Sequence, residues 1–149
     1  MLMRIDGCIH TSFDGVFDNT GYSNVLVLDV DATLRCGEGR LHLIPTEEER
    51  LKAFQEGNAN AAWTKFNDAS DTDTPLWGNI SVANRFYTDH AVMVLTSCTY
   101  SQRAAEILKK QLKEWGVKFD MIFMRHPDNH LHPVEMKETF INDLTEIVD

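Results

Sequence analysis

Two aspartates spaced two residues apart directly follow a short apolar run. Asp29 and Asp31 come after the apolar residues 25–28. Two carboxylates that leave a buried strand are costly unless a cation neutralises them, and such oxygen ligands suit Mg²⁺, which also contacts substrate phosphate. One carboxylate can attack phosphorus to form an aspartyl-phosphate, and its neighbour can act as general acid and base. The alternative is that Asp29 and Asp31 only cap a turn.

A second polar group ends the apolar run at residues 91–96. Ser97, Cys98 and Thr99 follow that run and precede a predicted helix that begins at Thr99. The free N–H groups and the dipole of a helix start favour an anion. Thr99 can cap the helix while Ser97 faces a phosphate, so capping and anion binding are compatible here.

A lysine lies on the apolar stripe of the last predicted helix. We expect one buried face to carry Lys137 together with Val134, Ile141, Leu144 and Val148. A lysine on such a face needs a partner, and a carboxylate or a phosphate near Asp29 would supply one. The alternative is that its stem lies on the apolar surface while the ammonium group reaches water.

Alternating strands and helices must position these groups. Strands are predicted at 25–28, 91–96 and 120–124, and helices at 79–90, at 99–115 and from Pro133 onward. This order implies right-handed crossovers on a parallel sheet, which is an α/β fold. Ligands of open parallel sheets bind beyond the carboxyl ends of the strands, where Asp29 and Ser97 are expected.

Residues 35–78 lack sheet character and are predicted to form a helical insertion or lid after the first core strand. Thr46 and Glu49 make a capping box at a helix start, and Trp63 and Phe66 are spaced to share a helix face. A loop rich in Asp, Ser and Thr follows at 68–75. Residues 1–23 are expected to form an extended arm or a hairpin.

Length and composition indicate one domain spanning residues 1–149. Hydrophobic residues make up 43% of the chain, which is enough for a core. The net charge of −9 comes without a basic stripe, so any nucleic-acid contact is expected to be local, at an end or a single nucleotide. The chain has three cysteines, an odd number without a CxxC pair, which argues against a disulfide scaffold. Without a signal peptide or an apolar run of about 18 residues, we expect a cytoplasmic protein that does not enter membranes.

The three polar groups together resemble the haloacid-dehalogenase (HAD) superfamily of phosphatases. Its DxDxT motif is matched by Asp29, Asp31 and Thr33, its second-strand hydroxyl by Ser97 (with Thr96 as alternate), and its lysine by Lys137. The resemblance implies a three-layer Rossmannoid fold with a short parallel sheet. It also implies a phosphoric monoester hydrolase that uses Mg²⁺ held by Asp29 and Asp31.

A narrower likeness, over residues 24–145, is to the phosphatase domain of phage-type polynucleotide kinases. It is carried by Met124-Arg125 with Pro133 to Glu138, and by segments 40–42 and 73–75 of the insertion. This likeness implies that a terminal phosphate is removed from a nucleotide or a polynucleotide 3′ end. Asp29 is then the nucleophile, Asp31 the general acid and base, and Ser97 and Lys137 hold the phosphoryl oxygens. The same likeness places Thr33 and Cys98 beside the phosphate, while Arg125 contacts substrate or braces its loop.

The chain departs from the family in three places, one of which is Ser97-Cys98-Thr99 where relatives often have Ser-Gly-Arg. Relatives carry a fourth strand ending in acidic residues that complete the metal site, and no such strand is predicted after the lysine helix. Asp120 and Asp128 are the stand-ins that the sequence offers. Ala32 stands where glycine is commoner.

Three alternatives stay open. A non-catalytic domain of the same fold would bind a nucleotide, a nucleic-acid end or a protein. His126, His130 and His132 beside Asp128 could bind a transition metal, or one of them could touch substrate. Cys98 at a helix start could act as a nucleophile, although no C-x5-R spacing follows it. A homodimer formed through an exposed sheet edge is also compatible with the sequence.

Overall fold

A four-stranded mixed sheet forms the centre of the molecule. The computed structural model describes residues 7–10 and 24–148, and within them the strand order is β1-β6-β5-β2. β2, β5 and β6 run parallel, and β1 joins β6 antiparallel. The strands are β1 (Cys8–His10), β2 (Val25–Leu28), β5 (Ala91–Thr99) and β6 (Met121–Arg125). The predicted α/β class with a parallel core is therefore confirmed.

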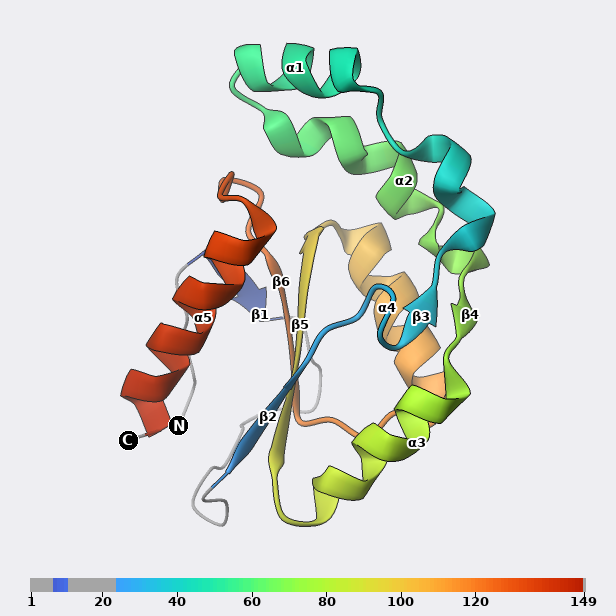
Figure 1. Ribbon diagram of the computed structural model, residues 1–149, viewed down its shortest axis with the longest axis vertical. Coiled ribbons are helices and arrows are strands. Elements are labelled where there is room, and N and C mark those ends of the chain that lie inside the picture. Colours follow the sequence, from blue (N-terminus) through green and yellow to red (C-terminus); the bar gives the residue numbers. More distant parts are fainter. Residues whose placement is uncertain (1–6, 11–23, 149) are drawn as a thin grey trace.

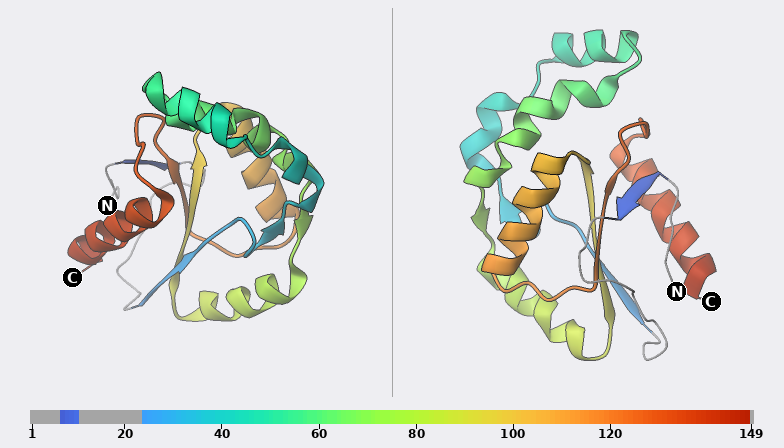
Figure 2. Two further views of the ribbon diagram at one scale, coloured as in Figure 1. Left: turned by 45° about the horizontal axis from the view of Figure 1, so that its top comes forward. Right: turned by 180° about the vertical axis from the view of Figure 1, so that it is seen from behind.

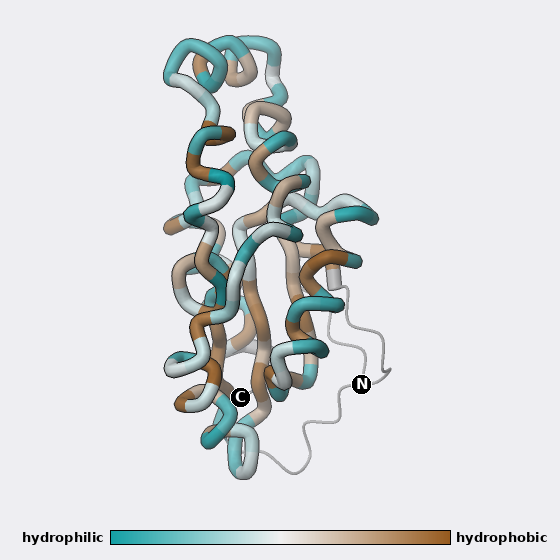
Figure 3. Tube along the Cα trace, turned by 90° about the vertical axis from the view of Figure 1, so that its right-hand side faces the viewer, coloured by the Kyte–Doolittle hydropathy of each residue, from teal (hydrophilic) through white to brown (hydrophobic). Residues whose placement is uncertain are grey.

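Helices cover both faces of this sheet, which gives three layers (Figures 1 and 2). α3 (Trp77–Arg85) and α4 (Gln102–Glu114) lie on one face, and α5 (Pro133–Val148) lies on the other. Side chains alternate across a strand, so Val92 and Val94 of β5 face α4 while Met93 and Leu95 face α5. The strands are accordingly the apolar centre of the molecule in Figure 3.

The strands differ in burial according to their place in the sheet. β5 lies between two neighbours and its residues 91–96 are buried, as the continuous apolar run predicts. β2 was expected to be buried on both faces, yet Val25, Leu26 and Val27 are only half-buried. The reason is that β2 ends the described sheet and pairs only with β5 there.

The segment between β2 and α3 rises beyond the carboxyl ends of the parallel strands. It contains the 3-10 helices η1 (Glu38–Leu43), η2 (Ala59–Trp63) and η3 (Ser70–Thr72), with α1 (Glu47–Gln55) and α2 (Thr64–Asp68). A short antiparallel pair, β3 (Arg35–Cys36) with β4 (Thr74–Pro75), closes its base. We call residues 37–73 the cap. The predicted insertion thus exists as a helical unit, although part of the expected loop at 68–75 forms η3 and β4.

Local capping explains where the helices begin and end. The capping box of Thr46 and Glu49 is present at α1, and Gly116 ends α4 with a φ of 68°. The predicted start of α4 at Thr99 is wrong, because β5 extends through Thr99. Ser101 is the actual cap and accepts a hydrogen bond from the N–H of Ala104 (3.0 Å).

The buried face of α5 differs from the predicted one. Val134 and Ile141 are 65% and 48% exposed. Met136, Phe140 and Leu144, which follow one another at intervals of four residues, pack against the sheet instead. Lys137 lies at the border of this face and is half-buried.

β1 agrees with the expected extended arm at residues 8–10; residues 1–6 and 11–23 lie outside the described residues. None of the helices in the described part is long and apolar enough to cross a membrane.

Candidate functional site

Asp29 and Lys137 meet at the carboxyl end of β2. Asp29 follows the last residue of β2, and Lys137 lies in the second turn of α5, 108 residues further along the chain. The Lys137 Nζ donates a hydrogen bond of 2.9 Å to the Asp29 Oδ1. The two side chains are 32% and 42% exposed, so a ligand can reach both. The predicted proximity of Lys137 to Asp29 is therefore confirmed.

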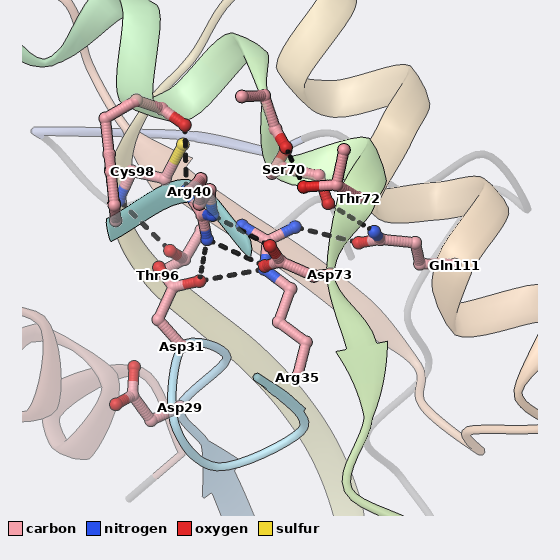
Figure 4. Close-up of polar contacts among 12 residues, drawn as sticks. Asp29, Asp31, Arg35, Arg40, Ser70, Thr72, Asp73, Thr96, Cys98 and Gln111 are labelled. Atoms are coloured by element: carbon pink, nitrogen blue, oxygen red, sulfur yellow. Dashed lines mark hydrogen bonds and ion pairs between the residues drawn. The ribbon is translucent and has the colours of Figure 1, made fainter. Parts of the chain in front are cut away.

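A tight turn after Asp29 aims the next acidic side chain toward the cap. The buried carbonyl of Val30 accepts hydrogen bonds from three N–H groups, those of Thr33, Leu34 and Arg35. Within this turn Ala32 adopts a φ of 61°, a left-handed conformation that glycine adopts at lower cost. The turn separates the two aspartates: Asp29 faces α5, and Asp31 faces the cap (Figure 4).

Asp31 belongs to a network of ionic hydrogen bonds between the core and the cap (Figure 4). Its Oδ1 accepts from the Arg35 Nε at 2.8 Å and from the Arg40 Nη2 at 2.9 Å. Arg40 also donates two hydrogen bonds of 2.8 Å to the carboxylate of Asp73. Arg35 donates to Gln111 on α4 at 2.9 Å. Both arginines are 2% exposed, so each is buried and satisfied by charged or polar partners.

The network sets the ionisation of Asp31. Burial alone would raise the pKa of Asp31, but the charges and hydrogen bonds of Arg35 and Arg40 outweigh burial and lower that pKa below its usual value. Burial raises the pKa of Asp73, and the same two arginines oppose the rise. The bidentate pair with Arg40 favours the charged form of Asp73 and so limits this rise. Asp31 is therefore a carboxylate at neutral pH, and its protonated form is rarely populated there.

Charges around the site balance. Three carboxylates, those of Asp29, Asp31 and Asp73, face three cations, which are Lys137, Arg35 and Arg40. The formal sum is −3 + 3 = 0. A phosphate dianion added to this group would leave an excess of two negative charges. One divalent cation bound with it would restore balance.

The donor set suits Mg²⁺ in a minimal form. The Oδ2 atoms of Asp29 and Asp31 take no hydrogen bond or ion pair within the described part of the chain. Mg²⁺ is commonly held by one or two carboxylates, substrate phosphate and water, so Asp29 together with a phosphate is sufficient to hold it, while the Asp31 side chain points toward the cap (Figure 4). No group of three metal-binding side chains occurs among the described residues.

Asp120 and Asp128 do not provide a third carboxylate for the candidate metal site among the described residues. Asp120 accepts a hydrogen bond from the N–H of Val92 (2.7 Å) at the start of β5, which is the opposite end of the sheet from Asp29. Asp128 lies in the loop after β6, where its own N–H donates to the Nδ1 of His126 (3.0 Å).

The end of β5 supplies hydroxyls with different environments. The Thr96 hydroxyl is buried and accepts from the N–H of Cys98 (3.0 Å). This hydrogen bond engages the N–H of Cys98 and the hydroxyl of Thr96, the residue that was the alternate to Ser97 for phosphate binding. The side chain of Ser97 is half-buried, and within residues 7–10 and 24–148 no hydrogen bond engages its hydroxyl. Ser97 is therefore available to a ligand at this edge. Its contact with phosphate stays a prediction, as does that of Thr33 in the turn after β2.

Cys98 has the properties of a structural thiol. It is 6% exposed, and burial is the main reason that its pKa rises to about 11. A thiol with that pKa is protonated at neutral pH and a poor nucleophile. This environment disfavours the alternative of cysteine catalysis.

Arg125 braces the loop after β6. It is 3% exposed and donates to three backbone carbonyls, those of Ser97, Asn129 and Leu131 (2.7–2.9 Å). Burial lowers its pKa. Of the two predicted roles, these contacts favour bracing.

The histidine loop shows local capping rather than a metal site. The Nδ1 of His126 accepts from the N–H of Asp128 (3.0 Å), and the Nδ1 of His132 accepts from the N–H of Val134 (3.2 Å). Both nitrogens are thus occupied by turns that shape the loop before α5. The exposed His130 has no role that these contacts define.

The arginine network is the part of the site that sequence reasoning missed. Segments 40–42 and 73–75 carried the family likeness, but no pairing of Arg40 with Asp73 was predicted. One sequence signal could have identified Arg35 as part of the site: it is a charged residue next to the apolar Leu34, directly after the DxDxT motif.

Comparison with known proteins gave no relative: no family model, curated protein or solved structure matches this chain. The site must therefore be interpreted from its own geometry.

Proposed function

We propose that this protein is a phosphoric monoester hydrolase of HAD-like fold that forms an aspartyl-phosphate on Asp29. The observation that carries the proposal is the 2.9 Å contact of Lys137 with Asp29 at the carboxyl end of a parallel strand. The order of the motifs supports it: an acidic turn after β2, a hydroxyl at the end of β5, and a lysine on the helix after β6. The cap between β2 and β5 supports it too.

In the first step an oxygen of Asp29 attacks phosphorus, the bond to the leaving oxygen breaks, and an aspartyl-phosphate forms. Lys137 has three N–H donors, one of which bonds Asp29. The remaining donors can stabilise the phosphoryl oxygens as negative charge shifts onto them. The Ser97 hydroxyl lies at the end of the adjacent strand, where it can donate a further hydrogen bond.

In the second step water attacks phosphorus of the aspartyl-phosphate, inorganic phosphate leaves, and Asp29 is regenerated. Asp31 is ionised, so it can accept the proton of that water. The proton held by Asp31 then passes to the leaving oxygen of the next substrate, and the cycle balances. The arginines that lower the pKa of Asp31 favour the base role over the acid role.

Mg²⁺ held by Asp29 and the substrate phosphate would neutralise the dianion. The balanced charges of the site imply that metal and phosphate bind together. Phosphate-free protein is therefore expected to bind Mg²⁺ weakly, and calorimetry with and without orthovanadate checks this coupling.

The proposed substrate is a nucleotide or a polynucleotide 3′-phosphate end, on the basis of the resemblance. Other phosphorylated small molecules belong to the same reaction class. The proposed location is the cytoplasm.

The test is hydrolysis of p-nitrophenyl phosphate and of nucleoside 3′- and 5′-monophosphates with Mg²⁺. Asp29→Asn should abolish turnover, since the amide cannot attack phosphorus. Lys137→Met should reduce kcat/KM by about 10²–10³-fold. Asp89→Asn, which changes an exposed acid before β5, is the matched control and should retain activity. Absence of turnover in the wild type on all these substrates refutes the proposal.

Asp31→Asn separates the two steps. With p-nitrophenyl phosphate, whose leaving group needs no proton, the variant should release one equivalent of nitrophenol in a burst and then turn over slowly. The slow phase reflects water attack without its base, with a loss of about 10²–10⁴-fold. A variant that loses burst and steady state equally would show that Asp31 acts otherwise.

A second candidate function is binding without turnover. The observation that favours it is the engagement of Asp31 by two arginines, together with the lack of a group of three metal-binding side chains in the described residues. In that case the wild type and Asp29→Asn would bind a nucleotide with similar affinity, and neither would hydrolyse it.

A further inference from the structure

A half-open cavity lies between the cap and the core at the same end of the sheet as Asp29. It lies where η2 and α2 of the cap pass over the loops that follow β5 and β6 (Figure 1). Its volume is about 190 Å³. The catalytic groups proposed above and this cavity thus share the carboxyl edge of the sheet.

The lining of the cavity exposes more apolar than polar surface, and its described residues include no cation. The cap contributes three carboxamides, those of Asn58, Asn60 and Asn67, and the core contributes Tyr100 and neighbouring hydroxyls. None of the described residues that line it is a lysine or an arginine, and one, Asp68, is acidic. Such a lining disfavours a second phosphate and suits an uncharged ligand that both donates and accepts hydrogen bonds.

Two of the carboxamides are free for a ligand. Asn60 donates to the carbonyls of Pro127 and Asn129 (3.2 and 2.9 Å), so it joins the cap to the core. Within the described residues, no hydrogen bond engages the side chains of Asn58 and Asn67. A carboxamide both donates and accepts hydrogen bonds, as the Watson–Crick edge of an unpaired base does, and an aromatic side chain such as Tyr100 offers a surface on which a base can stack.

The volume limits the size of the occupant. A protein cavity of about 150 Å³ accommodates benzene, so 190 Å³ accepts one six-membered ring with its substituents. A bicyclic purine would exceed this volume and extend through the open side of the cavity into solvent.

We propose that the cavity receives the pyrimidine base of a nucleotide whose phosphate lies at Asp29 and Lys137. This assignment rests on the proposed function for its phosphate end, and on the cavity alone for its base end.

The first test measures base binding without any reaction. Cytidine is titrated into the full-length protein while the side-chain amide signals of asparagine are followed by NMR. The signals of Asn58 and Asn67 should shift. The matched control is Asn84, which bonds Gly116 and Lys118 near the far end of α4 and should not shift. Adenosine should cause smaller shifts than cytidine.

A filling substitution makes this test specific. Ala61 lines the cavity and is exposed, so Ala61→Phe can occupy the space without disturbing the core. The variant should lose the cytidine-induced shifts. Shifts that persist in Ala61→Phe, that are equal at Asn84, or that are absent in the wild type overturn the proposal. None of these readouts requires hydrolysis.

The second test compares substrates. Ala61→Phe should lower kcat/KM for cytidine monophosphates at least about tenfold, and should lower kcat/KM for ribose 5-phosphate, which carries no base, much less. Asn67→Ala should raise KM for the same nucleotides about 3–10-fold, since one hydrogen bond is lost. An equal loss with ribose 5-phosphate would assign the cavity to the sugar and refute the pyrimidine. If the wild type hydrolyses nothing but binds cytidine as described, the phosphatase proposal fails and the base site stands.

Discussion

Asp29 and Asp31 lie two residues apart, yet different cations surround them. Lys137 contacts the first, while Arg35 and Arg40 engage the second. Two residues of the same type therefore have different partners at one turn, because the backbone directs the Asp29 side chain toward α5 and the Asp31 side chain toward the cap. Spacing predicted the two acids, but their partners depend on segments far along the chain.

The lowered pKa of Asp31 has a consequence for stability in acid. A carboxyl group whose pKa is lower in the folded protein stabilises the fold above its unfolded pKa, near 3.8, and this contribution disappears as pH falls through the lower folded value. The unfolding free energy of the wild type should thus fall over this acidic range. Urea titrations should show a shallower fall for Asp31→Asn. Parallel curves for the two proteins would contradict the assignment.

The left-handed Ala32 is expected to be a site of strain. Its φ of 61° costs about 1–2 kcal/mol for a residue with a Cβ, and replacement by glycine adds about 0.5–1 kcal/mol of unfolded-state entropy. Ala32→Gly should therefore stabilise the protein by about 0.5–1 kcal/mol in urea unfolding. Ala69→Gly is the control: its φ is −92°, so glycine there should be destabilising. A loss of stability in Ala32→Gly would show that the turn is unstrained.

At the scale of elements, the cap is joined to the core chiefly by charge. Arg40 lies in η1, contacts the Phe66 ring at 4.1 Å and donates to the Phe66 carbonyl, Asp73 and Asp31. One buried guanidinium therefore holds two parts of the cap to the acidic turn after β2. The orientation of the cap over the site depends on this residue.

Asp73 should be the most sensitive carboxylate of the cap. Asp73→Asn leaves two buried arginines with Asp31 as their shared charged partner, and loss of one member of a buried ionic network typically costs about 3–5 kcal/mol. Asp71→Asn is a matched control two residues away. Its pair with Arg103 spans 3.5 Å between exposed side chains, so it should cost less than about 1 kcal/mol. Thermal and urea unfolding measure both, and equal losses would show that the buried network adds no stability.

Element types were predictable where the sequence has strong periodicity or strong caps. The β-branched run of β5, the capping box at Thr46 and the glycine stop at Gly116 are local signals, and each gave the correct element. The start of α4 was not predictable, because Thr99 and Ser101 are both good caps and pairing of β5 with β6 decides between them. The face of α5 also depends on tertiary packing: several stripes of that helix are apolar, and the sheet selects Met136, Phe140 and Leu144.

At the scale of the molecule, the fold predicts a gradient of local stability. β5 is central and buried, whereas α1 contains no buried residue and exposes Leu51 and Phe54 by 55% and 71%. Local opening free energies follow such differences in burial. Native-state hydrogen exchange should be fastest in α1 and slowest in β5. Protection of α1 equal to that of β5 would imply that another surface covers this helix.

The α/β class and the insertion were predictable from the sequence as a whole, because strand and helix patterns alternate and residues 35–78 interrupt them. The convergence of Asp29 with Lys137 followed from the rule that ligands bind at strand ends. The network of Arg35, Arg40 and Asp73 could not be predicted, since it depends on how the cap folds back onto the turn. The cavity beneath η2 and α2 could not be predicted either, because it too depends on how the cap folds back onto the core.

The chain leaves the core at Leu34 and re-enters it at Leu76, where the N–H of Leu76 donates to the carbonyl of Leu34 at 3.0 Å. The 41 intervening residues therefore form an excursion whose two ends touch. Lengthening such an excursion costs little entropy, because loop closure grows only with the logarithm of length. Exchange of this one segment can thus change the surface above the carboxyl edge of the sheet, while the sheet and Asp29 beneath it keep their geometry.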